Sequence, residues 1–178
     1  MAESLWADLD TWQEQVLTAL LGPSSAYATL QAQMVIATLV RDYHEWDNAD
    51  FWQFPAVIIA GSRRSHLEEQ IQHGPGGLTS YKMVNLYSWI AVCEGDRQTA
   101  MRDAKILGKR LENAARLLEA ESWGQSGSQP IPADQTGEQL TQAILGDSNI
   151  GIYPRTASAE ALPYYGVAAL DLSFITTT

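Results

Sequence analysis

The segment from Ser80 to Glu121 constrains the fold most, because a long apolar strand leads almost directly into a long amphipathic helix. The predicted strand, Tyr81 to Cys93, carries apolar side chains on both of its alternating faces. Glu94-Gly95 forms a turn, and Asp96 is the predicted N-cap of a helix that continues to Leu118. One face of the strand is expected to pack on this helix. The other face must meet a second internal layer or a neighbouring subunit.

The rest of the apolar pattern predicts an α+β fold: a mostly antiparallel sheet flanked by N-terminal helices and one long amphipathic helix after the second strand. Apolar residues at helical spacing predict a helix from Ser4 to Leu21 and favour a second from Tyr27 to Tyr43, with a strand from Met34 to Val40 as the alternative. Phe54 to Gly61 and Tyr165 to Ile175 read as strands. The length of 178 residues suits a single domain.

Several segments lack a clear period and are expected to connect these elements. Residues 62–80 form a predicted nineteen-residue loop in which Ser65 to Gln72 could make a helical turn. Residues 1–43 form a predicted N-terminal helical segment. Residues 122–137, which follow the long helix, read as an extended connector. Gln139 to Leu145 is expected to be a short helix, and Ile150 to Pro154 a brief strand or arm.

The charge pattern excludes binding that depends on neutralising nucleic-acid phosphates. The formal net charge is −10, and residues 1–60 contribute −7 of it. An acidic surface repels a DNA duplex and lets it slide past. A single cysteine, Cys93, permits no internal disulfide and is expected to be buried. The sequence shows neither a signal-peptide pattern nor an apolar run long enough for a membrane helix, so a soluble, non-secreted protein is expected.

No motif for catalysis, cofactor binding or metal binding stands out. The glycine-rich run from Gly74 to Gly77 lacks the Lys-Ser/Thr of a phosphate-binding loop and reads as a turn. The histidines have neither the helical spacing nor the neighbouring ligands that a metal site needs. The sequence therefore predicts no enzyme, no cofactor and no metal.

The order of elements resembles the tail-terminator family of tailed bacteriophages. The resemblance is carried by the N-terminal amphipathic helix and the strand beginning Phe54-Pro55-Ala56, followed by the strand from Tyr81 that passes through Glu94-Gly95-Asp96 into the long helix. It continues in the arm Gly151-Ile152-Tyr153-Pro154-Arg155 and the final strand from Val167, and chiefly covers residues 51–121 and 150–176. The helical segment from Tyr27 and the connector after Glu121 depart from the family pattern.

The resemblance implies a structural protein of the virion neck, assembled in the host cytoplasm. Such a protein forms a ring, expected to be a hexamer, which caps the tail tube, meets the neck or stopper protein and lets DNA pass through its lumen without specific binding. A stopper or another head–tail connector is the alternative within the same class. Closure of a ring needs two different, complementary surfaces on each subunit. The candidate interface residues are Tyr81, Tyr87, Trp89, Arg63, Arg64, Gly76, Tyr153 and Arg155.

A different class remains open as a second hypothesis. A small intracellular enzyme or ligand-binding α+β domain would place its site between the loop at 62–80 and the acidic segment at 44–50. His44, His66 and Asp47 would then be the groups to test.

Overall fold

A computed structural model describes residues 3–22, 35–41, 52–72, 79–122, 129–130, 139–154 and 163–177. Within these ranges, side chains are described for residues 9–22, 35–41, 52–65, 82–116, 142–154 and 163–176. The α+β class and the predominance of sheet that the sequence predicts are confirmed. The elements follow one another as α1 (Glu3–Leu21), β1 (Thr38–Arg41), β2 (Ala56–Gln72), β3 (Thr79–Gly95), α3 (Arg97–Ser122), β4 (Gln129–Pro130), β5 (Gln139–Pro154) and β6 (Tyr164–Thr177).

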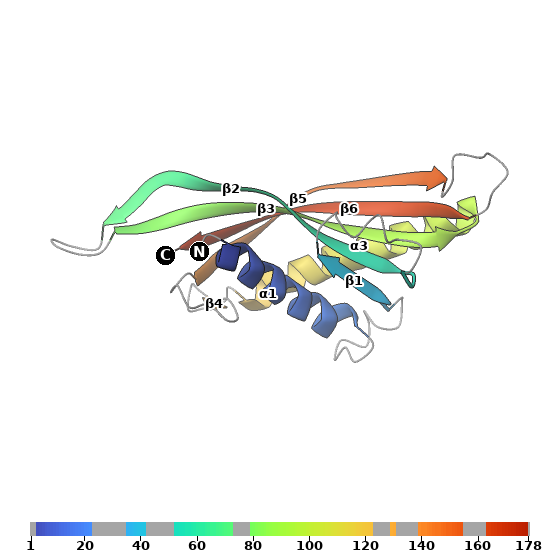
Figure 1. Cartoon of the computed structure of the whole chain (residues 1–178), viewed down its shortest axis with the longest axis horizontal. Helices are drawn as coiled ribbons and strands as arrows, with labels where there is room; N and C mark the ends of the chain where they lie inside the picture. Colours follow the sequence, from blue (N-terminus) through green and yellow to red (C-terminus); the bar gives the residue numbers. More distant parts are fainter. Residues whose placement is uncertain are drawn as a thin grey trace.

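The described strands form one sheet in the order β1-β2-β3-β6-β5-β4 (Figure 1). β1 pairs parallel to β2, and all other neighbours pair antiparallel. The C-terminal strand β6 thus lies between β3 and β5, where Trp89 is opposite Leu170 and Leu145 is opposite Leu172. The long strand predicted at Tyr81 to Cys93 is central to this sheet.

Two of the expected connecting elements lie wholly or partly in strands instead. The predicted loop at 62–80 is wrong at 62–72 and 79–80, because β2 continues to Gln72 and β3 already begins at Thr79, while residues 73–78 lie outside the described residues. The two strands form a long hairpin that projects beyond the helices in Figure 1. The predicted helix from Gln139 to Leu145 is wrong, because these residues belong to β5, and β5 also includes Ile150 to Pro154, where a brief strand is one of the two predictions. Pairing with neighbouring strands overrides the weak local pattern in both cases.

The favoured helix from Tyr27 to Tyr43 is wrong at its C-terminal end, where Thr38 to Arg41 form β1. Residues 23–34 and 42–51 lie outside the described residues. The alternative of a strand near Met34 to Val40 was the better one for this part. Four residues of β1 gain their backbone partners from β2, in a parallel register with Thr38 opposite Ala56.

α3 begins where the sequence predicts, because Asp96 caps it. Its Oδ1 accepts the backbone N–H groups of Gln98 and Thr99, each at 2.9 Å, and its Oδ2 accepts the Thr99 hydroxyl at 2.8 Å. The bond from the Thr99 backbone does most to lower the pKa of the Asp96 carboxyl. The cap therefore stabilises the charged form of the Asp96 carboxylate, and a negative charge interacts favourably with a helix N-terminus.

The main core lies between the sheet and the two described helices. α1 and α3 lie on the same face of the sheet (Figure 1), and their apolar stripes pack on the same set of strand residues. Trp12 of α1 meets the ring of Phe174 edge-on, with the centroids 5.7 Å apart. The fully buried side chains at the centre of this core are Leu9, Leu17, Leu21, Ile59, Trp89, Leu107, Leu111 and Phe174.

α3 approaches β6 so closely that Gly166 has no room for a side chain. A Cβ built at Gly166 would lie 1.9 Å from the Ala100 backbone oxygen and 3.0 Å from the Ala104 Cβ. At Gly108 on the helix, a Cβ would lie 2.8 Å from the Ala168 Cβ. Small residues on both surfaces therefore set the distance between α3 and the sheet.

Candidate functional site

The aromatic face of β3 lies inside the protomer, contrary to the expectation that it makes subunit contacts. Tyr87 is 1 % exposed and Trp89 is fully buried. The indole N–H of Trp89 donates a hydrogen bond of 2.8 Å to Oε1 of Gln13 on α1, so the helix satisfies the one polar group of the ring. The alternating pattern of β3 assigns its side chains to the correct two faces, but the face with the aromatic side chains packs against the helices. Tyr87 and Trp89 are core residues and not contact anchors.

Polar groups accompany the aromatic side chains at this helix–sheet boundary. Burial and the nearby Asp10 carboxylate raise the pKa of the Tyr87 hydroxyl above its ordinary value. Burial also raises the pKa of the Cys93 thiol to about 12, which keeps it protonated. The predicted buried cysteine is therefore confirmed. None of these groups faces an open cleft among the described residues.

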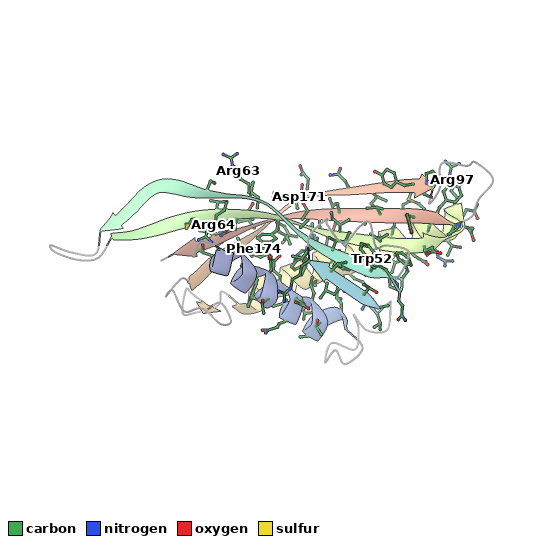
Figure 2. The ribbon with its side chains drawn as sticks, viewed as in Figure 1. Trp52, Arg63, Arg64, Arg97, Asp171 and Phe174 are labelled. Carbon is green, nitrogen blue, oxygen red and sulfur yellow. The ribbon has the colours of Figure 1, made fainter. Side chains whose placement is uncertain are left out.

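The two candidate arginines of β2 follow a β-bulge and lie on opposite faces of the strand. The pairing register shifts between Gly61 and Arg63, so that Arg63 lies opposite Leu86 and Arg64 opposite Asn85. Figure 2 shows Arg63 pointing away from the helices and Arg64 toward them. Nη2 of Arg64 lies 2.8 Å from the Met83 sulfur, whereas Arg63 is exposed. Only Arg63 of this pair is free to contact a partner on the side opposite the helices.

The face opposite α1 and α3, here called the outer face, carries the remaining described candidates. Tyr153 on β5 is 57 % exposed there and lies over Gly151. The backbone of Tyr81 pairs with Gln70 in the β2–β3 hairpin, but its side chain lies outside the described residues. Gly76 and Arg155 also lie outside them. The structure therefore brings Arg63 and Tyr153 to one face and removes Tyr87 and Trp89 from it.

The outer face is apolar over much of its area. A small buried cluster, which includes Ile58, Val92 and Tyr165, lies at the end nearest β1, and the ring of Phe54 packs at a tilt against that of Tyr165, with the centroids 5.5 Å apart. Beyond it, half-buried and exposed apolar side chains continue along the strands, and no described helix covers them. Ser88 and Asp171 form the polar centre of this surface through a 2.6 Å hydrogen bond. The partly exposed apolar residues are Val84, Leu86, Ile144, Val167, Ala169 and Ile175.

A second surface is a groove of about 710 Å³ between α3 and β5. Its rim carries Arg97, Arg102 and Lys105, and its floor is formed by Met101, Ile106 and Ile152. The sequence pattern gave no reason to separate these bases from an ordinary solvated helix face. The sequence feature that could have indicated this groove is the clustering of basic residues: six of the eleven Lys and Arg residues fall between Arg97 and Arg116, in a chain with net charge −10.

The guanidinium of Arg110, also on α3, is buried and has no hydrogen-bond partner among the described residues. The side chain is 0 % exposed, and none of its three nitrogens makes a hydrogen bond within the described part of the chain. Burial lowers its pKa, although an arginine stays protonated at neutral pH. A buried charge without a partner destabilises the folded state.

Replacing Arg110 with methionine is therefore expected to raise the free energy of unfolding by about 1 to 4 kcal/mol, the gain seen when buried ion pairs are replaced by well-packed apolar side chains. Urea denaturation followed by tryptophan fluorescence measures the change. Arg116→Met is the matched control, because Arg116 is exposed on the same helix and its loss should change stability little. Equal destabilisation by both substitutions would contradict the prediction.

The groups named for an enzyme or ligand site are not assembled by the described residues. His44 and Asp47 lie outside them, and His66 is described only through its backbone pairing with Met83. Within the ranges that the structure describes, no three His, Cys, Asp or Glu side chains come together as metal ligands. In those ranges, moreover, neither helix has a stretch that is both apolar and long enough to cross a bilayer.

Comparison with known proteins gives no family assignment. No protein-family model matches the chain, and no curated protein matches it at a significant level.

Proposed function

We propose that this protein is a structural subunit of a bacteriophage neck, a tail terminator that caps the tail tube and joins it to the head. The observation that supports this proposal best is the placement of α1 and α3 on one face of the sheet. The outer face then presents apolar side chains that no described helix covers, and contiguous surfaces of this kind mark contact sites. The long β2–β3 hairpin adds a projecting element suited to reach a neighbour.

The proposal places the protein in the virion as a ring of about six copies through which DNA passes. The two edges of the sheet differ, with β1 at one and β5 with β4 at the other. Different edges allow the head-to-tail contacts that close a ring. A net charge of −10 gives a wall that a polyanion crosses without adhering. A stopper or other neck connector shares these requirements and differs in which neighbour it binds.

Size-exclusion chromatography with light scattering tests the proposal, first on the chain alone and then with the tail-tube protein of the same genome. We expect a species near six times the 19.6 kDa of one chain, alone or on addition of the tube protein. Binding to the portal-side neck protein but not to the tube would favour the stopper. A monomer in every mixture, with a melting temperature raised by a small metabolite, would contradict a role in assembly.

Leu86→Asp should abolish that assembly while leaving the protomer folded. Leu86 is half-buried on the outer face, where a carboxylate remains solvated in the free chain but loses its water in an interface. The matched control is Gln15→Asp, which adds the same charge at an exposed position of α1. Light scattering measures assembly and thermal melting measures folding. Normal rings from Leu86→Asp would show that the outer face is not a contact surface.

A further inference from the structure

The groove beside α3 has the composition of a docking site for an acidic segment that contains aromatic residues. Three basic side chains surround an apolar floor, and Ile106 remains 36 % exposed at its edge. Arg102 pairs with the neighbouring Asp103 at 3.0 Å, whereas Arg97 and Lys105 form no ion pair within the described residues. Two bases therefore face solvent beside an apolar surface. A partner with carboxylates and aromatic side chains would match both, because its carboxylates would pair with the bases and its rings would cover the apolar surface.

The edge of β5 that faces away from β6 borders this groove, and its backbone N–H and C=O groups can form hydrogen bonds with an added strand. In the described part of the chain, β5 pairs with β4 only at Gln139 and Leu140. The edge from Gln142 to Pro154 has no strand partner among the described residues. An extended peptide could therefore add to this edge and place alternate side chains over the groove.

One segment of this chain has the complementary composition. Residues 42–50 read Asp-Tyr-His-Glu-Trp-Asp-Asn-Ala-Asp, with four carboxylates, two aromatic side chains and no Lys or Arg. We propose that this acidic segment of a second copy of the chain docks in the groove between α3 and β5. Its carboxylates would pair with the basic rim, and Tyr43 and Trp46 would cover the apolar floor.

The position of the segment in the sheet favours docking in a second copy over docking in its own groove. The segment joins β1 to β2, and β1 lies at the sheet edge opposite β5. From β1 to β5 is four strand spacings, about 19 Å. The eleven residue steps from Arg41 to Trp52 span about 36 to 40 Å, so a segment held at both ends extends at most about 18 to 20 Å before it must return. The groove also lies on the helix side of β5, which lengthens the path. A neighbouring copy placed edge to edge brings the two surfaces together in a head-to-tail contact.

This inference rests on the proposed ring, but its first test does not need one. A fluorescein-labelled peptide of residues 42–50 is titrated with the full-length chain at about 50 mM salt, and anisotropy reports binding. We expect saturable binding that weakens as salt rises. The double substitution R102E/K105E should weaken it by about tenfold or more, because like charges then face each other. Arg116→Glu is the control, since it reverses an exposed base on the same helix outside the groove, and should leave binding unchanged.

A charge exchange in the full chain tests the contact within the assembly. R102E/K105E and E45K/D47K should each prevent ring formation, and the chain that carries all four substitutions should recover it. Rings formed equally by wild type and R102E/K105E would overturn the groove contact and leave the terminator proposal intact. Peptide binding by a chain that forms no ring would support the groove contact and contradict the terminator proposal.

Two further outcomes would overturn the inference. The first is no peptide binding up to about 1 mM, which corresponds to less than about 4 kcal/mol of binding free energy. The second is equal peptide binding by wild type and R102E/K105E. A DNA duplex that binds wild type and loses binding in R102E/K105E, with no peptide binding, would assign the groove to nucleic acid instead.

Discussion

Replacing Gly166 with alanine is expected to lower the free energy of unfolding by about 3 kcal/mol or more, a large part of the total stability of a domain this size. The added Cβ would meet the backbone oxygen of Ala100 at 1.9 Å. That atom belongs to α3 itself, so the clash cannot be relieved by rotating a side chain. The helix must move away from β6, which opens the core around Leu107 and Leu111.

Gly151→Ala is the matched control for this prediction. There the new Cβ would come within 2.9 Å of the Tyr153 hydroxyl oxygen, which is the far end of an exposed side chain and can turn away. We expect a change within about 0.5 kcal/mol. Urea denaturation of both variants measures the difference. If Gly166→Ala were no less stable than Gly151→Ala, the close approach of α3 to β6 would be incorrect.

Trp89→Ala is expected to lower the free energy of unfolding by about 3 to 5 kcal/mol, because it removes a fully buried indole and leaves a cavity. It also leaves Oε1 of Gln13 without its 2.8 Å donor in a buried site. Differential scanning calorimetry at one protein concentration measures the loss. Tyr153→Ala removes a large aromatic side chain that is 57 % exposed and should hardly change the melting temperature.

The same pair of variants separates a core role from an interface role. If Trp89 were a subunit contact, its replacement would leave the melting of the isolated chain unchanged and weaken assembly alone. The structure predicts the opposite order: Trp89→Ala destabilises the protomer itself. Any effect of Tyr153→Ala should appear only when partners are present.

The elements that the sequence predicts well are those whose local signals agree with their surroundings. The strand at Tyr81 to Cys93 lies at the centre of the sheet with its aromatic face in the core, and Asp96 marks the start of α3 through its own hydrogen bonds. Alternation also separates the side chains of β3 into their two faces. It cannot say which face the helices cover, since both are apolar and α1 comes from a distant part of the chain.

The missed strands carry side chains that resemble loop or helix patterns. From Ser62 to Gln72, β2 is mostly polar, because this part of the hairpin extends beyond the helices and has no need of a buried face. In β5, Leu140, Ile144 and Leu145 have helical spacing by coincidence, and two register shifts break the alternation that would reveal the strand. The groove beside α3 was missed for a related reason, since its floor includes Ile152 from β5.

The central position of β6 has a consequence for synthesis on the ribosome. Its residues, 164–177, are the last of the described strands to be translated, yet they separate β3 from β5. Until they emerge, β3 keeps one edge unpaired, and β5 can pair only with the two residues of β4. The nascent chain therefore holds exposed, apolar strand edges until β6 has emerged, which makes chaperone binding during translation an asset for this protein.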